Sequence, residues 1–159
     1  MDFTYAGSAR FGMIQGMPII HETILTTARN EMIEITARVQ HAIERRPVTS
    51  GFVIVYVSHT TAAVTINENA DPAVKSDVLR KLADLIPQNE RYYQHDEGNS
   101  DAHLKASLVG SSVTVLIENG RLQLGRWQGI FLCEFDGPRE RRVLVKLVDL
   151  QPVPRAELV

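Results

Sequence analysis

The stretch Phe52-Val-Ile-Val-Tyr-Val57 decides the fold class of this 159-residue chain. It consists entirely of β-branched and aromatic residues, and Gly51 opens it. A strand without polar alternation is typical of a position that is buried on both faces. We therefore expect this strand in the interior of a layered protein. The run is also far too short to cross a bilayer.

Segments on either side of this run carry the signals of further strands and helices. The sequence predicts strands at residues 19–27, 62–67, 112–118, from 121 onward, at 129–135 and at 142–150. It predicts helices from an N-cap at Thr36 to before Pro47, from Asp71-Pro72 to Pro87, and over residues 100–108. Packed sheets with helices on one side or end would bury this pattern. The expected fold class is α+β, with β-sandwich-like mixed sheets and two or three helices.

Several local signals fix boundaries and faces within this pattern. Asn119-Gly120 supplies the positive φ values of a type I′ hairpin turn. Gly110 is placed to end the third helix. The spacing of four apolar residues predicts the inner face of the second helix: Val74, Val78, Leu82 and Leu85.

Composition and charge exclude several classes of protein. Hydrophobic residues at 44% and charged residues at 23% fit one globular domain over 1–159, with an irregular arm at 1–18 and a tail at 151–159. The formal net charge of -2 argues against a general nucleic-acid partner. No signal peptide or membrane span is evident, so we expect a soluble cytoplasmic protein. The single cysteine, Cys133, excludes an intramolecular disulfide.

Polar residues concentrate in three segments that core patterning does not explain. The first is Ser58-His-Thr-Thr61, continued by Asn67-Glu-Asn-Ala-Asp71. His59 follows the apolar strand, where an imidazole can bind a metal or move a proton. Alternatively, the imidazole has a structural role and forms hydrogen bonds with backbone groups at the end of the strand. The run at 67–71 is more polar than helix capping requires, although a turn alone would also explain it.

The second segment is His95-Asp-Glu-Gly-Asn-Ser-Asp-Ala-His103. Imidazoles together with carboxylates suit zinc, iron or manganese, whereas carboxylates alone suit magnesium. The spacing matches no standard metal motif, so a solvated polar loop is the alternative. Asp101 lies near the positive end of the predicted helix, where it would also compensate the helix dipole.

The third segment runs from Leu124 to Arg139. Side-chain alternation gives its strand two faces, with Ile130, Leu132 and Glu134 on one and Phe131, Cys133 and Phe135 on the other. A carboxylate on an apolar face needs a cation, a metal or a proton. Glu134 is therefore either a metal ligand or the structural partner of Arg139 or Arg141. We expect Trp127 and Cys133 in the core.

Six motifs stand in order along about residues 22–149. They are Ser58-His-Thr-Thr-Ala-Ala63, Asn67-Glu-Asn-Ala-Asp-Pro72, Glu97-Gly-Asn-Ser-Asp-Ala-His-Leu104, Gly120-Arg-Leu-Gln-Leu-Gly125, Trp127-Gln128 and Glu134-Phe-Asp-Gly-Pro-Arg139. Together they closely resemble the YjbQ family, the secondary thiamine-phosphate synthase-like proteins. Arg126 stands where that family often has threonine.

The resemblance implies a compact α+β fold with a β-sandwich-like core over residues 19–150. It also implies assembly as a homotrimer, sites near subunit boundaries, and bound metal ions in some members. The activity implied is the formation of thiamine phosphate from a hydroxymethylpyrimidine diphosphate and a thiazole phosphate, either as the main reaction or as a side activity.

We therefore expect the three segments to form one site of a metal-dependent small-molecule enzyme that acts on a small phosphorylated metabolite. The catalytic candidates are Glu134, Asp101 and Arg139. The candidate ligands for a divalent ion, zinc or magnesium, are His59, His95 and His103. The candidate substrate-binding residues are Thr60, Thr61, Asn67, Glu68, Asn99, Trp127 and Gln128. A flat ring could be covered by Trp127, Tyr92 or Tyr93. The alternatives are a non-catalytic metabolite- or metal-binding trimer and a metal-assisted hydrolase.

Overall fold

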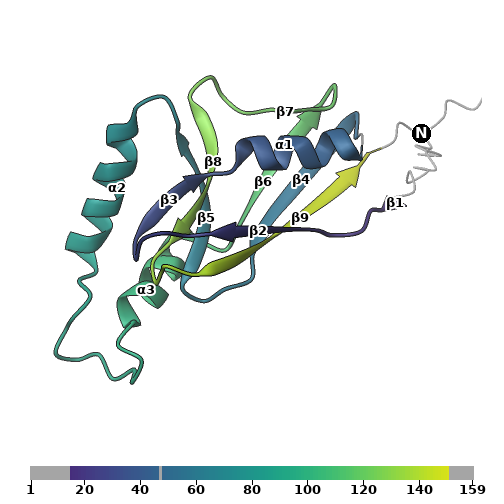
Figure 1. Cartoon of the computed structure of the whole chain (residues 1–159). Coiled ribbons are helices and arrows are strands. Elements are labelled where there is room, and N and C mark those ends of the chain that lie inside the picture. Colours follow the sequence, from purple (N-terminus) through teal and green to yellow (C-terminus); the bar gives the residue numbers. More distant parts are fainter. Residues whose placement is uncertain (1–14, 47, 151–159) are drawn as a thin grey trace, which may run out of the picture.

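A computed structural model describes residues 15–46 and 48–150 (Figure 1). Its strands are β1 Gln15–Gly16, β2 Ile20–Leu25, β3 Glu31–Glu34, β4 Ser50–Val57, β5 Ala62–Glu68, β6 Ser112–Glu118, β7 Arg121–Leu122, β8 Gln128–Glu134 and β9 Glu140–Asp149. Its helices are α1 Thr36–Arg45, α2 Pro72–Leu85 and α3 Ser100–Val109. Most of the arm predicted for residues 1–18 and the whole tail at 151–159 lie outside the described residues.

The strands form two antiparallel sheets, which confirms the α+β prediction. The larger has the order β1-β9-β4-β6-β7, with β2 also paired to β9, and the smaller has the order β3-β8-β5. In Figure 1, α1 crosses in front of the larger sheet, whereas α2 and α3 lie toward the smaller one. None of the helices in the described part of the chain combines the length and apolarity needed to cross a bilayer.

The central strand of the smaller sheet, β8, is buried on both faces and lies between two apolar cores. Ile130 and Leu132 join the core between the two sheets and α1. Phe131 and Cys133 join a second core with residues of α3 and, partly buried, of α2. The alternation predicted for this strand is therefore confirmed. Glu134 ends the strand with its side chain fully buried.

Three predictions about burial and capping were wrong. β4 is fully buried on one face only: the residues of its other face are partly buried, and Tyr56 on that face is 42% exposed. Trp127 is 55% exposed rather than in the core, since it precedes β8 in a surface loop. Thr36 is the first helical residue instead of the N-cap, and its hydroxyl accepts the backbone N–H of Ile130 at 2.8 Å.

The second helix begins as predicted but packs less deeply. The Asp71 carboxylate accepts the backbone N–H of Ala73 at 2.8 Å and caps the helix. Val78 and Leu82 are partly buried against the second core, as expected for the inner face. Leu85, however, is 61% exposed, and no residue of α2 is fully buried. The helix therefore covers the edge of the core.

Candidate functional site

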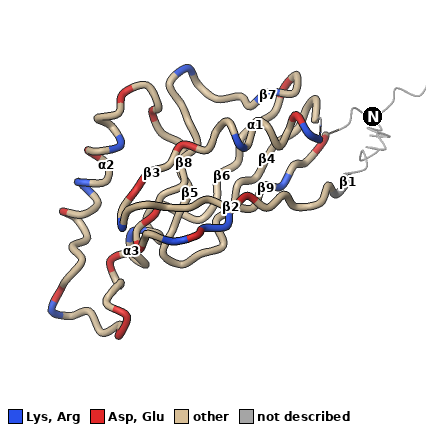
Figure 2. The backbone as a smooth tube through the Cα atoms, in the orientation of Figure 1, with Lys and Arg blue, Asp and Glu red and all other residues tan. Residues whose placement is uncertain are grey.

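The three polar segments meet around one cavity of about 310 Å³, which we call the polar hollow. The first segment is the β4–β5 loop, the second is the start of α3 with the loop before it, and the third is the β8–β9 turn with the start of β9. The lining residues are Ser58, His59, Thr60, Thr61, Glu97, Asn99, His103, Asp136, Arg139 and Arg141. Acidic and basic positions stand side by side along the start of β9, near α3 (Figure 2).

Glu134 and Arg141 form a buried ion pair beside the polar hollow. The Glu134 carboxylate accepts Nε and Nη2 of Arg141 at 2.6 and 2.5 Å. It also accepts the hydroxyl of Thr26 at 3.0 Å and the backbone N–H groups of Phe135 and Asp136 at 3.0 and 2.8 Å. Of the two arginines considered from the sequence, the partner is Arg141. Because both carboxylate oxygens are engaged, Glu134 acts on the hollow through the guanidinium that it holds.

Asp136 fixes the opposite wall of the hollow. Its carboxylate accepts Nη2 of Arg139 at 2.5 Å, Nη1 of Arg29 at 3.1 Å and the Asn99 amide at 3.0 Å. The Asn99 amide nitrogen also donates to Glu97 at 3.3 Å, so two carboxylates determine which way the amide faces. Its Oδ1 is buried without a hydrogen-bond partner in the described part of the chain. A donor that reached this oxygen would recover about 1–3 kcal/mol.

Asp101 has no exposed surface and lies behind the hollow. It accepts Nη2 of Arg29 at 2.9 Å and Nζ of Lys105 at 2.7 Å. Lys105 is itself 2% exposed, because it follows one helical turn after Asp101 on the same side of α3. The pair thus anchors α3 and, through Arg29, connects to Asp136. This geometry gives Asp101 a positioning role.

His59 is held in one tautomer at the end of β4. Its Nε2 accepts the backbone N–H of Arg142 at 2.9 Å, which leaves the proton on Nδ1. The pKa of His59 is lowered below the usual 6.5, mainly because the imidazole is partly buried and also because the Arg141 guanidinium is near. At neutral pH this side chain is therefore an uncharged donor at the polar hollow.

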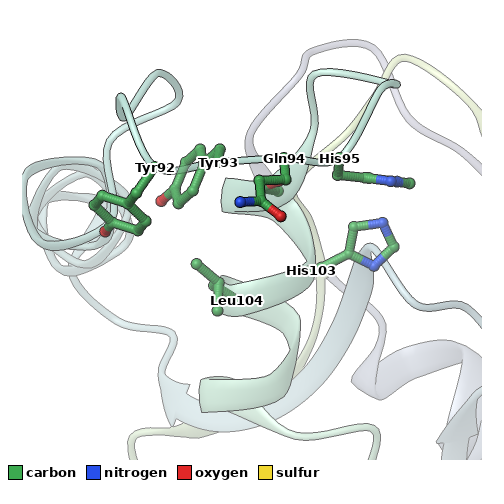
Figure 3. A pocket seen from close by; sticks show the side chains of 7 residues that line it. Tyr92, Tyr93, Gln94, His95, His103 and Leu104 are labelled. Carbon is green, nitrogen blue, oxygen red and sulfur yellow. The ribbon is translucent and has the colours of Figure 1, made fainter.

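His95 lies in a neighbouring hollow, which it shares with His103 (Figure 3). The two imidazole rings meet edge to face with centroids 5.1 Å apart. His95 Nε2 is 3.8 Å from the Glu97 carboxylate. His103, on the first turn of α3, lines both hollows. The predicted histidines thus divide between two adjoining spaces.

Four predicted substrate-binding residues lie at the other end of the smaller sheet. Asn67 pairs with Gly129 and Glu68 with Gln128, whereas Ala62 pairs with Glu134 beside the hollow. Six residues of an extended strand separate these ends by about 20 Å. Asn67, Glu68, Trp127 and Gln128 therefore form a second group, and one copy of the chain does not bring it to the polar hollow.

A protein-only metal site does not fit these residues. Within residues 15–46 and 48–150, no three histidine, cysteine or carboxylate side chains are arranged to share an ion. Glu134 is saturated by donors, and Nε2 of His59 is occupied by a backbone N–H. The divalent ion stays a prediction, and metal analysis of the purified protein tests it.

Two residues that pair with the carboxylates around the hollow escaped the sequence analysis. Lys105 had a usable signal, because it stands four residues after Asp101 on a predicted helix. Arg29 had none, since it belongs to the β2–β3 loop and is distant in sequence from both carboxylates that it binds. Asp136 stood inside the last of the six motifs without an assigned role, and Arg141 was one of the two candidate partners of Glu134; both line the hollow.

The chain is similar to proteins of bacteria and archaea. The family model described as UPF0047 protein YjbQ-like matches residues 21–150. UPF0047 protein YugU of Bacillus subtilis is 51% identical over 125 residues, which is 79% of this chain and 95% of that protein. A UPF0047 protein of Methanocaldococcus jannaschii is 52% identical, covering 79% of this chain and 90% of that protein.

Solved structures agree with this relationship. An uncharacterized conserved protein of the YjbQ/UPF0047 family from Clostridium acetobutylicum is 49% identical, with a TM-score of 0.79 over 80% of this chain and 98% of that one. A YbjQ-like protein of unknown function from Sulfolobus solfataricus is 29% identical, with a TM-score of 0.80 over 86% of this chain and 99% of that one. The chain belongs to the YjbQ/UPF0047 family.

Proposed function

We propose that this protein is a cytoplasmic small-molecule enzyme with thiamine-phosphate-synthase-like activity, and that the polar hollow binds the phosphorylated end of its substrate. The observation that carries the proposal is a surplus of directed donors. The carboxylates of Glu134 and Asp136 are already occupied by arginine, hydroxyl and amide groups. Donors remain at the hollow that those carboxylates do not use.

These donors come from both arginines, a hydroxyl and an imidazole. Arg139 and Arg141 each use Nε and Nη2 for hydrogen bonds within the protein. In the described part of the chain, Nη1 of each arginine has no such bond and is available to a ligand. The Thr61 hydroxyl accepts Arg141 Nη2 at 2.9 Å and is free to donate its own proton. With Nδ1–H of His59, this set suits a phosphoryl group, because charge-assisted hydrogen bonds to phosphate are strong.

The proposed reaction uses this donor set on a leaving diphosphate. The carbon–oxygen bond of the hydroxymethylpyrimidine diphosphate breaks, and the diphosphate leaves with the electron pair. The thiazole nitrogen gives its lone pair to the same carbon, which forms the carbon–nitrogen bond and a cationic thiazolium ring. Donors fixed in advance around the leaving oxygens stabilise the charge that develops there. Arg139 and Arg141 are the residues to which we assign this role.

A divalent ion would enter the site together with the diphosphate. Mg²⁺ is usually held by one or two carboxylates plus substrate phosphates, so it needs no protein-only cage. Glu97, whose side chain is 70% exposed on the wall of the hollow, offers such a carboxylate. When bound, the ion would neutralise charge on the leaving group.

A homotrimer is the second part of the proposal. The group Asn67, Glu68, Trp127 and Gln128 lies about 20 Å from the polar hollow in one chain. A neighbouring copy that placed its own group against the hollow would join all the predicted substrate-binding residues in one site. The outer side of β4 and β6 supports assembly, because Tyr56 and Leu116 are 42% and 65% exposed there and large exposed apolar surfaces commonly mark interfaces.

The test is product formation from the two thiamine precursors, with and without a divalent ion. We expect thiamine phosphate from the wild-type protein with the ion, and a loss of at least about tenfold in rate for Arg139→Ala. The matched control is Arg38→Ala on α1. The Arg38 side chain is also 52% exposed and ion-paired, but it binds Glu22 and does not line the hollow. Equal rates for both variants would contradict the proposal.

Two further outcomes would select the alternatives. Tight binding of a phosphorylated pyrimidine without turnover above a chelated control would indicate a binding protein. Release of free diphosphate or phosphate from one precursor, without the second, would indicate a metal-assisted hydrolase.

A further inference from the structure

We infer that the hollow next to the polar one is the subsite for a flat aromatic ring, so that the ligand is an aryl- or heteroarylmethyl phosphate or diphosphate. This second space, the aromatic hollow, measures about 550 Å³ and lies between the loop after α2 and the first turn of α3. The inference rests on the proposed function, because the phosphate of the same ligand would occupy the polar hollow.

The lining of the aromatic hollow is apolar on one side and imidazole on the other. Figure 3 shows Tyr92 and Tyr93 along one edge, Leu104 below them, and His95 with His103 at the far edge. Tyr92 is 71% exposed and Leu104 is 45% exposed, so neither is used by the core. Pockets that bind small molecules are lined largely by apolar and aromatic groups, with a few polar groups for orientation.

The tyrosine edge has a fixed geometry. The rings of Tyr92 and Tyr93 meet edge to face with centroids 5.0 Å apart. The Tyr93 hydroxyl donates to the carbonyl oxygen of Pro87 at 3.3 Å, which ties the middle of the loop to its start. Preorganised aromatic side chains give binding surface at low entropic cost. Gln94 and Ser100 add polar groups that a ring nitrogen or amino group could meet.

His103 connects the two hollows. It lines the aromatic hollow, the polar hollow and a further polar cavity of about 360 Å³ beside His59. A ligand with its phosphate at Arg139 and Arg141 would pass His103 before its apolar end reached the tyrosines. The sequence left Trp127, Tyr92 and Tyr93 as candidate ring platforms. Of these three, the tyrosines line the hollow that shares His103 with the polar hollow, whereas Trp127 stands at the far end of β8.

The experiment compares three probes that share a phosphate: methyl phosphate, cyclohexylmethyl phosphate and benzyl phosphate. Equilibrium binding to the wild-type protein should be about tenfold tighter for the benzyl than for the methyl ester, with the cyclohexyl ester between them. Tyr92→Ala should remove most of the gain for the benzyl ester and change methyl phosphate binding by less than about twofold. Compared with Tyr92→Ala, Tyr92→Leu should regain more affinity for the cyclohexyl ester than for the benzyl ester.

The variants also separate this inference from the proposed function. If Arg139→Ala leaves methyl phosphate binding unchanged, the assignment of the phosphate to the polar hollow is wrong, and the proposed function fails with it. If methyl phosphate binds through Arg139 but the benzyl ester binds no more tightly, only the ring subsite is overturned. If Trp127→Ala, rather than Tyr92→Ala, weakens the benzyl ester, the ring lies against Trp127 of a second copy and the inference is likewise overturned.

Discussion

Replacing Glu134 by glutamine keeps the size of a fully buried side chain and removes its charge. The remaining amide oxygen can still accept the backbone N–H groups of Phe135 and Asp136, which both bind Oε1. The amide NH₂ would then face Nε of Arg141, so that two donors meet where a carboxylate oxygen stood. The variant thus leaves a guanidinium that is 5% exposed without its counter-charge.

The expected loss of stability is large because the pair is buried. Removing one partner of a buried ion pair costs about 3–5 kcal/mol, since the other charge stays desolvated. For a domain of this size each kcal/mol lowers Tm by about 2–4 °C, so Glu134→Gln should lower Tm by roughly 6–20 °C. The matched control is Glu31→Gln. Glu31 is paired with Glu134 across β3 and β8, but its carboxylate accepts hydrogen bonds from the backbone N–H and the hydroxyl of the exposed Thr27.

Urea unfolding followed by circular dichroism, at one protein concentration, measures the free energy of unfolding of both variants. The comparison holds when the slope of that free energy against urea concentration equals that of the wild-type protein. We expect about 3–5 kcal/mol for Glu134→Gln and about 1 kcal/mol or less for Glu31→Gln. A value for Glu134→Gln within about 1 kcal/mol of wild type would refute the reasoning. If the variant instead lost a bound divalent ion while keeping its stability, Glu134 would belong to a metal site.

Three further predictions concern Cys133, His59 and Gly137. Burial raises the pKa of the Cys133 thiol to about 12, so a thiol reagent should leave the native protein unlabelled near neutral pH and label it fully in urea; native labelling would contradict this. The lowered pKa of His59 means that the unfolded chain binds more protons than the folded one just below pH 6.5, so the free energy of unfolding should fall on acidification through this window. His59→Gln should lack that part of the pH dependence, and an unchanged profile would remove His59 as its source. Gly137→Ala would put a Cβ 2.8 Å from both Glu134 Cγ and Thr26 Oγ1, and chemical unfolding should show a loss of about 2–3 kcal/mol; a near-neutral effect would mean that this turn can yield.

Local signals in the sequence predicted local structure well. Asn119 and Gly120 have φ values of 53° and 72°, as the type I′ turn requires. Asp71 caps α2, and Gly110 with φ 101° ends α3. Each of these outcomes depends on the conformational preferences of one or two residues, so no knowledge of distant partners was needed.

Predictions that required a distant partner fared less well. The continuous apolar run of β4 suggested burial on both faces, yet its outer face is only partly buried. Periodicity alone cannot tell whether other parts of the protein cover a given face of a strand. β3 was missed because Glu31–Glu34 is a short strand with two charged ends, and its pairing with β8 determines its structure. In the same way, two arginines were candidate partners of Glu134, and no local signal distinguished between them.

The candidate site was likewise predicted in part, from local position, and missed in part, where the fold decides which residues meet. The residues at 58–61, 97–103 and 134–139 lie near strand and helix ends that the fold places at one edge of the smaller sheet, so three of the motifs converge. The residues at 67–68 and 127–128 belong to the same two strands but to their opposite ends. A sequence shows that a residue is polar and where it lies in a strand. It does not show whether the two ends of one strand serve one site or two.

The proposed binding of an anion at the polar hollow has to be reconciled with a net charge of -2. Cationic and acidic side chains are equal in number there: Arg29, Lys105, Arg139 and Arg141 against Glu97, Asp101, Glu134 and Asp136. An incoming phosphate would therefore gain little from long-range attraction. It would gain from N–H and O–H groups that the buried carboxylates hold in fixed directions, with no reorganisation at the moment of binding. In this proposal Glu134 and Asp136 belong to the site without touching the ligand, because they set the directions of Arg141 and Arg139, which would bind it.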